Sequence, residues 1–449
     1  MASRDRRERC GLLDRRRRLG TAMTPRFRPW PLRELVADLR AGRTTPDEAL
    51  ARARRRIAET DAELRAWVAC DPAPAVTATA GPLGGVPLAV KDIIDVAGLP
   101  TRCGSALRVD IGPAASDAAI VRAWRHAGAV PIGKTVTTEF AFFAPGPTRN
   151  PAAPGHTPGG SSSGSAAAVA AGHVPLALGS QTAGSVTRPA AFCGIAAMVM
   201  SRGRFALDGV VGLSPGLDSH GLFAATVSDV ALAWSALTGD PDAGLDEQRP
   251  PRLLVWRAEA HSGVEPATRA TMDAATSRLR AAGAVVDEIA DESPISALTI
   301  AHRVVMAYEA ARERAAELAV AHRLSEPLGS LLRTGAAIPH EDYEAARRAV
   351  ARAAERLALV SASYDAVLGP AAQGSAPAGL ASTGDPVLSR AWQALGLPVV
   401  TVPGLRGDTR LPLGVQLVGR ARGEAALLGI GCWVEGVLRG GIRPSVLTR

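Results

Sequence analysis

The spacing of apolar residues predicts two helices near the N-terminus. Over residues 31–58, apolar side chains recur at helical intervals from Leu32 onward, and Gly42 interrupts the pattern. The segment Thr45–Glu48 reads Thr-Pro-Asp-Glu, which has the order of a capping box with proline at the first helical position. We therefore expect a helical pair (residues 30–60) that clasps the main body of the protein.

Residues 82–250 alternate short apolar runs with helical patterns. We expect strands at Val86–Val90, Val130–Ile132, Val174–Leu178 and Ala196–Met200, and helices at Ala115–Ala127, Ser162–Ala171 and Ser228–Leu237. Such alternation of strands and helices is typical of an α/β layered fold.

The remaining chain is helical at first and then returns to strands. A strand ending at Val255 precedes an Arg- and Ala-rich stretch that we expect to be largely helical. Apolar strand segments then recur at Ala366–Leu368, Val399–Val402 and Val415–Val418. Because these strand segments come so late in the chain, we predict one domain over residues 23–449. The helices of about 260–360 would be an insertion into that domain. The Gly-, Ser- and Pro-rich loop Ala371–Pro386 is expected to border a pocket.

Composition excludes several protein classes. The chain has 449 residues, of which 47% are hydrophobic, so it can bury a large globular core. No apolar run reaches the ~18–20 residues that cross a bilayer, and we expect no membrane partner. The five cysteines lack CxxC spacing, which indicates reduced thiols in the cytoplasm and neither a disulfide frame nor a zinc site.

The net charge of +8 is concentrated at the N-terminus. Residues 1–22 contain eight arginines and three acids, including the run Arg15–Arg18, so they carry +5. Such a run could bind nucleic acid or target the protein, although it lacks the apolar stretch of a secretory signal. We expect a disordered tail or a start-site artefact, a true start at Met23, and no nucleic-acid partner.

One lysine and two Gly/Ser-rich stretches carry the candidate chemistry. Lys91 follows the apolar run Val86–Val90, and the stretches Pro158–Gly172 and Gly179–Ala190 come later. A serine hydroxyl attacks a carbonyl only after a base removes its proton. A lysine can be that base when desolvation keeps it neutral. An exposed Lys91 paired with Asp92 is the alternative.

The turn Gln181–Ser185 is suited to an oxyanion hole. Its small residues Ala183 and Gly184 let backbone N–H groups approach a substrate carbonyl closely. Ser185 would attack from the same turn, and Ser161 lies 24 residues earlier.

Two other interpretations of these stretches are weaker. None of the eight histidines lies in a Gly-x-Ser-x-Gly context, so we expect surface or hydrogen-bonded histidines. The roles of His156 and His173, which flank the serine-rich loop, are left open. A Gly-rich loop before a helix also attracts phosphate, but neither the P-loop pattern nor the dinucleotide-binding fingerprint is present.

Taken together, the segments around Lys91, Gly159–Gly172 and Gly179–Cys193 resemble the amidase signature family. Further stretches agree with that family in order: Gly128–Thr135, Glu139-Phe140, Asn150-Pro151, Ala191–Gly194, Gly396–Pro398 and Pro412–Gly419. The resemblance extends over roughly residues 30–435.

This resemblance implies a fold and a catalytic triad. The fold would be α/β, with a mixed β-sheet core covered by helices on both faces. Ser185 would be the acyl-forming nucleophile, Ser161 a bridging serine after a cis peptide bond, and Lys91 the base. The oxyanion would be held by the backbone N–H groups of Thr182, Ala183, Gly184 and Ser185. No cofactor and no metal are implied.

The chain departs from the common family pattern near Ser185. Many members have Asp where Gln181 stands and Gly where Ala183 stands. A smaller, malonamidase-like branch has Gln together with an arginine, three residues after the nucleophile, that binds a substrate carboxylate. Arg188 has that offset, so Gln181 and Arg188 are candidate substrate-binding residues, with a structural ion pair as the alternative for Arg188. Ala197–Ser201 replaces the usual Gly-Leu-Lys-Pro-Thr, which alters a loop near the site.

We therefore predict an amidase that hydrolyses a small amide through a Ser acyl-enzyme and prefers an amide bearing a carboxylate. The alternatives are a glutaminase-type component of an amidotransferase, an amide-forming or acyl-transfer enzyme of specialised metabolism, and a catalytically silent binding protein. The expected partner is the small-molecule amide, and a homodimer is left open.

Overall fold

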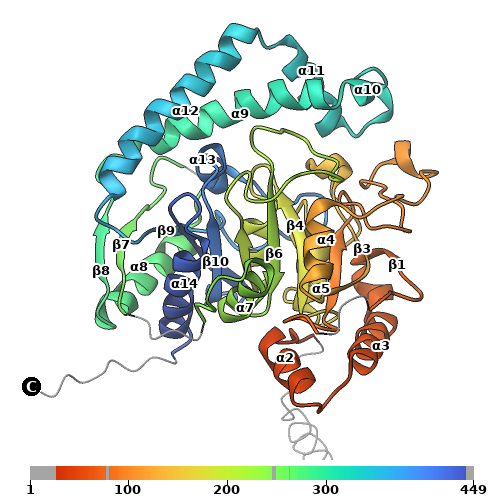
Figure 1. Ribbon diagram of the computed structural model, residues 1–449. Coiled ribbons are helices and arrows are strands. Elements are labelled where there is room, and N and C mark those ends of the chain that lie inside the picture. The colour runs from red at the N-terminus through yellow and green to blue at the C-terminus, as the bar shows by residue number, and fades with distance from the viewer. Residues whose placement is uncertain (1–26, 77–79, 245–248, 262, 441–449) are drawn as a thin grey trace, which may run out of the picture.

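The centre of the protein is a mixed β-sheet of eleven strands (Figure 1). The computed structural model describes residues 27–76, 80–244, 249–261 and 263–440, so the predicted tail 1–22 lies outside the described residues. The strands are β1 Trp67–Cys70, β2 Pro87–Lys91, β3 Val130–Thr135, β4 Leu176–Gln181, β5 Ala196–Val199, β6 Ser219–Ala224, β7 Arg252–Val255, β8 Val285–Glu288, β9 Ala366–Pro370, β10 Val399–Arg406 and β11 Pro412–Val418. Their order across the sheet is β1-β3-β2-β4-β6-β5-β10-β11-β9-β7-β8. The predicted α/β fold is confirmed.

Parallel pairing in one half of the sheet determines where the chemistry gathers. Strand β2 lies between β3 and β4 and runs parallel to both, with Leu88 opposite Leu176. Carboxyl ends of neighbouring parallel strands meet at the same edge of a sheet. Lys91 ends β2 and Gln181 ends β4, so the lysine and the turn after Gln181 lie at one edge.

The helices cover both faces of this sheet. Their bounds are α2 Leu32–Arg40, α3 Pro46–Leu64, α4 Ala119–His126, α5 Ser163–Ala170, α6 Thr187–Cys193, α7 Val227–Thr238, α8 Pro266–Ala281, α9 Ser293–Glu313, α10 Ala315–Leu318, α11 Glu326–Ala337, α12 His340–Ser361, α13 Val387–Leu395 and α14 Glu424–Leu438. Short 3₁₀ turns occur at Ala106–Arg108, Glu139–Ala141 and Ala321–Arg323. Helices α5 and α6 pack together on one face, and α7 and α14 pack together on the other.

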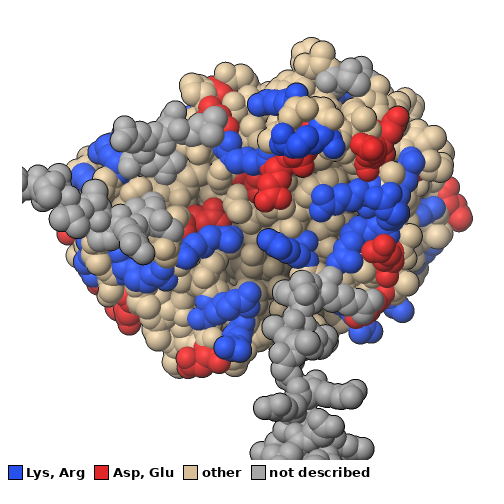
Figure 2. Space-filling model, turned by 90° about the horizontal axis from the view of Figure 1, so that it is seen from below, with Lys and Arg blue, Asp and Glu red and all other residues tan. Residues whose placement is uncertain are grey.

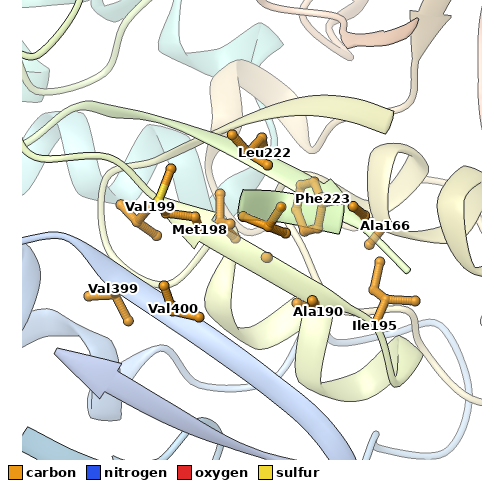
Figure 3. Packing of buried hydrophobic residues seen from close by; sticks show 14 of the residues in the cluster. Ala166, Ala190, Ile195, Met198, Val199, Leu222, Phe223, Val399 and Val400 are labelled. Carbon is orange, nitrogen blue, oxygen red and sulfur yellow. The ribbon is translucent and has the colours of Figure 1, made fainter. Parts of the chain in front are cut away.

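The core lies between the sheet and these helices. Figure 3 shows Met198 of β5 between Leu222 of β6 and Val400 of β10, while Phe223 lies near Ala166 of α5. Because successive strand residues point to opposite faces, Leu222 and Phe223 fill the cores of the two faces separately. This burial on both sides explains why the central strands read as continuous apolar runs.

Helix α5 approaches the sheet unusually closely because its residues are small. Its sequence is Ser-Gly-Ser-Ala-Ala-Ala-Val-Ala, and every residue is buried. A Cβ atom on Gly164 would collide with the carbonyl oxygen of Ala66 and the backbone nitrogen of Val136. Glycine is therefore required at 164, directly after the serine-rich loop.

The N-terminal helices form where the apolar pattern places them. The capping box is present, since the Thr45 hydroxyl accepts from the Glu48 N–H (3.2 Å) and the Glu48 carboxylate accepts from the Thr45 N–H (2.8 Å). Helix α2 packs on α7, where the Arg33 N–H donates to Asp229 (2.8 Å). The division of the chain into one domain with an inserted helical segment stays a prediction.

Residues 250–360 are largely helical, as expected, but strand β8 within them extends the sheet. Helix α9 packs on both α11 and α12 at the top of Figure 1, above the strand edge. Predicted bounds are shifted elsewhere, as at β4, which begins after Pro175 and not at Val174. Pairing with β2 begins at Leu176, which lies opposite Leu88.

Charged side chains are interspersed on the face seen in Figure 2. Lys and Arg groups lie on that face together with Asp and Glu groups. No helix in the described ranges is both long and apolar enough to cross a membrane. Four cysteines fall in those ranges, and the thiols of Cys70, Cys103 and Cys193 are free.

Candidate active site

Lys91 is completely buried at the end of β2 and points at two serines. Its Nζ lies 2.6 Å from Ser161 Oγ and 2.9 Å from Ser180 Oγ. Burial lowers the pKa of Lys91 to about 7, although the nearby Asp218 carboxylate acts in the opposite direction. A large part of the Lys91 population is therefore neutral near physiological pH, as a general base must be.

Ser161 and Ser185 line the same cavity. The Gly160–Ser161 peptide bond is cis, and Ser161 is nearly buried just before α5. Ser185 lies on the turn between β4 and α6, and both serines line the cavity. Among the residues that the structure describes, no hydrogen bond joins the two hydroxyls. The Lys91–Ser161 contact is thus formed, whereas the Ser161–Ser185 contact is not.

The turn after β4 presents free backbone donors to this cavity. Within the described part of the chain, no backbone oxygen accepts a hydrogen bond from the N–H of Ala183, Gly184 or Ser185. All three residues line the cavity, as does Thr182. Unpaired N–H groups on one turn are the arrangement that stabilises a developing oxyanion.

Gln181 supports this turn from behind. It is fully buried, and its Oε1 accepts from the N–H groups of Val186 (2.9 Å) and Thr187 (3.1 Å). Its Nε2 donates to Gln393 Oε1 of α13 (3.1 Å). Gln181 is not among the residues that line the cavity, so the geometry favours a supporting role over the predicted contact with substrate.

Arg188 lines the cavity with part of its guanidinium group unused. Its Nε donates to the Thr383 carbonyl (2.6 Å) and its Nη2 to the Gly160 carbonyl (2.7 Å). Its Nη1 is buried without a partner, and no carboxylate of the described residues lies within ion-pair distance of Arg188. Burial lowers the pKa of Arg188 to about 9, so it remains a cation at neutral pH.

The cavity is narrow and partly apolar. Its walls include two aromatic and two aliphatic side chains together with residues of the Gly- and Pro-rich loop: Phe142, Phe143, Leu213, Met306, Thr383 and Pro386. Its open interior of about 20 Å³ is room for about one water molecule. A larger cavity of about 470 Å³ lies between α12, α13 and β9, and none of the predicted site residues lines it.

The two histidines that flank the serine-rich loop do not reach the cavity. His173 is buried, its Nε2 lies 2.7 Å from Thr60 Oγ1, and its Nδ1 accepts from Trp67 Nε1 (3.0 Å). Burial lowers the pKa of His173 to about 3, which makes it a neutral link between α3 and β1. His156 Nδ1 lies 3.2 Å from the Pro154 carbonyl oxygen.

A different histidine, His302 of α9, reaches the turn after β4. Its Nε2 lies 2.8 Å from the Thr182 carbonyl oxygen, and its Nδ1 lies 3.1 Å from Arg390 of α13. Nothing in the apolar pattern around residue 302 distinguishes it, because the contact spans 120 residues. In the described residues, no group of three or more His, Cys, Asp and Glu could hold a metal ion.

Comparisons with known proteins agree with this geometry. A family model described as Amidase matches residues 48–428. The chain is 30% identical, over 86% of its length and 93% of the relative's, to a glutamyl-tRNA(Gln) amidotransferase subunit from Lachnospira eligens.

Solved structures of similar shape include two informative ones. The first, an inhibitor-bound vestigial protein complex related to the origins of an s-triazine catabolic enzyme, superposes with a TM-score of 0.81 at 28% identity. It covers 92% of this chain and 99% of its own. The second, a native peptide amidase from Stenotrophomonas maltophilia, has a TM-score of 0.74 at 27% identity and covers 93% and 99%.

Proposed function

Because the chain belongs to the amidase family and is therefore an amide hydrolase, we propose that it cleaves a small amide through an acyl-enzyme on Ser185. The observation that carries the proposal is the contact of a buried, desolvated Lys91 with Ser161 (2.6 Å), since both serines line one cavity. This contact supplies a base for a hydroxyl that no histidine reaches in the described structure.

The proposed reaction proceeds in two halves. In the first, Ser161 accepts the proton of the Ser185 hydroxyl and passes its own to the neutral Lys91 amine, while Ser185 Oγ bonds to the amide carbon. The carbonyl electron pair moves to oxygen, where the N–H groups of the turn stabilise it. When the C–N bond breaks, the proton returns through Ser161 to the departing nitrogen.

Water completes the second half by the same proton path. It attacks the ester carbonyl on Ser185, again with Lys91 and Ser161 removing a proton, and the carboxylic acid leaves. The proton held by Lys91 then restores the Ser185 hydroxyl. No group other than water is consumed.

The environment of Arg188 favours a substrate that carries a carboxylate. Its Nη1 is buried, cationic and unpartnered at the wall of the cavity, so an anionic group there would satisfy it. The aromatic wall of Phe142 and Phe143 would contact the apolar part of the same molecule. We therefore propose a small amide whose carboxylate binds Arg188 at the wall of the cavity.

A second candidate is a glutaminase-type component of an amidotransferase. The relative from Lachnospira eligens carries the name of such a component, which supports this interpretation. Gln181 in place of the family's usual Asp argues against it. An amide-forming or acyl-transfer enzyme would use the same acyl-enzyme. A cytoplasmic location and a homodimer also stay predictions.

The test is to trap the acyl group on a lone purified chain. A panel of small amides, with and without a carboxylate, is incubated with the protein, and release of ammonia or amine is measured. Mass spectrometry after rapid acid quenching should place the added acyl mass on the peptide containing Ser185. Turnover without any adduct on that peptide would contradict the proposal. Activity that appears only with added protein partners would favour the amidotransferase interpretation.

A further inference from the structure

His302 is the only described histidine that contacts the backbone of the turn bearing Ser185. It lies in the middle of α9, is completely buried, and places Nε2 2.8 Å from the Thr182 carbonyl oxygen. The other ring nitrogen, Nδ1, lies 3.1 Å from Arg390 Nη1. The imidazole thus bridges α13 and the turn.

The bonding partners determine the tautomer of this ring. An arginine has only N–H groups and can only donate, so Nδ1 of His302 accepts from Arg390. Burial and the Arg390 charge lower the pKa of His302 to about 3, so the ring is neutral at physiological pH. The ring proton is therefore on Nε2, and Nε2–H donates to the Thr182 carbonyl. Burial lowers the pKa of Arg390 to about 10, which leaves that side chain cationic.

The Thr182 carbonyl belongs to the same peptide group as the N–H of Ala183, a residue that lines the cavity. Hydrogen bonds in a chain polarise one another, by about 10–30% per bond, so a donor on this carbonyl strengthens the N–H on its other side. Arg390, His302 and the Thr182–Ala183 peptide then form a row in which each member donates toward the cavity. The row begins at a buried cation and ends where the oxyanion would form.

A second connection from α9 reaches the same threonine. Glu309, two helical turns beyond His302, accepts from Ser214 Oγ (2.6 Å), and the Ser214 N–H donates to Asp218 (3.1 Å). Asp218 in turn accepts from the Thr182 hydroxyl (2.5 Å). Helix α9 therefore holds Thr182 at its carbonyl and, through Asp218, at its side chain.

We propose that His302 is a positioning residue for the oxyanion hole, which orients and polarises the Thr182–Ala183 peptide, and that Arg390 selects its donating tautomer. The inference rests on the proposed acyl-enzyme function, because it assigns a purpose to the same turn. It also gives α9 a role in supporting the turn that bears Ser185.

A matched pair of variants separates this role from simple packing. His302→Gln can place an N–H₂ near the position of Nε2 and keep the donor to Thr182. His302→Asn keeps an acceptor near the position of Nδ1 for Arg390 but has no donor that reaches the carbonyl. We expect His302→Asn to lower kcat about 10-fold with KM changed less than about 2-fold, and His302→Gln to stay within about 3-fold of the wild type. Equal kcat values for the two variants, whether high or low, would overturn the proposal.

A measurement on the unaltered protein covers the case in which the variants fail to fold. ¹⁵N NMR of the imidazole rings should show His302 with a protonated Nε2 and a bare Nδ1, and the opposite tautomer or an imidazolium at neutral pH would overturn the proposal. Turnover by Ser185→Ala in the same assay would instead refute the proposed function. An inactive Ser185→Ala with indistinguishable His302 variants would refute the His302 role alone.

Discussion

The amine of Lys91 lies 2.6 Å from the hydroxyl of Ser161, at the end of a strand from which water is excluded. Desolvation disfavours the ammonium form of Lys91. The Ser161 hydroxyl can donate a hydrogen bond to the neutral amine or accept one from the ammonium group. This pair predicts a pH dependence. Protonation of a base with a pKa of about 7 removes the neutral amine as the pH falls.

We therefore expect kcat/KM to fall about 10-fold for each pH unit below about 7 and to be flat above it. The measurement is a profile of kcat/KM from mildly acidic to alkaline pH, with the protein shown to be folded at each end. A profile that stays flat into the acid range would show that no base titrating near neutrality is needed. Lys91→Met should be inactive across the whole range.

Ser185→Ala should abolish turnover, with a loss of about 10⁴-fold or more, because the acyl-enzyme can no longer form. Ser161→Ala should retain the nucleophile but lose its proton path, at a cost of about 10²–10⁴-fold. Ser235→Ala is the control, since that partly buried hydroxyl on α7 donates to the Asp240 carbonyl (2.7 Å) and Ser235 does not line the cavity. Retained activity in Ser185→Ala would contradict the assignment of Ser185 as the nucleophile.

Arg188→Ala should raise KM for amides that carry a carboxylate about 10-fold more than for neutral amides. A hydrogen bond to a charged group contributes about 1.5–3 kcal/mol, and only the acidic substrates would lose it. The ratio between the two substrate classes matters because Arg188 also supports the Gly160 and Thr383 carbonyls, and damage to those contacts affects both classes alike. Equal changes for the two classes would leave Arg188 with a structural role only.

A buried ion pair beside the site predicts a large loss of stability. Lys134 Nζ lies 3.0 Å from Asp92 Oδ1, and neither side chain is exposed. Lys134→Met would leave the Asp92 carboxylate buried without its counter-ion, and we expect a loss of about 3–5 kcal/mol in the free energy of unfolding. Urea unfolding measures this loss in the free energy of unfolding. Arg356→Ala, which removes an exposed ion pair, is the control.

That control removes the surface pair between Arg356 and Asp291 (2.9 Å), for which we expect a change below about 1 kcal/mol. The double variant Lys134→Met/Asp92→Asn should recover part of the stability lost by Lys134→Met, because no unpaired charge then remains buried. Equal losses of stability in Lys134→Met and Arg356→Ala would contradict the large contribution expected of the buried pair.

Local patterns were sufficient for several elements and for the order of the motifs. The strand that delivers Lys91 is a run of buried apolar residues, and the helix that ends at Leu64 is marked at its start by the capping box at Thr45. Strand β6 was missed because its sequence Ser-His-Gly-Leu-Phe-Ala lacks β-branched residues and begins with polar ones. It is buried in the middle of the sheet, where its neighbours on both sides supply the pairing that its own propensity does not.

The sequence by itself determined the family, the α/β class and the residue types near the reaction, because these depend on short-range order along the chain. Only the tertiary structure decided that Gln181 supports the turn and lies outside the cavity, that one nitrogen of Arg188 is left unpaired, and that His302 reaches Thr182. Those relationships join residues up to 212 positions apart, as between Gln181 and Gln393. Such contacts follow from how the strands are ordered and how α9 and α13 pack, which no local pattern encodes.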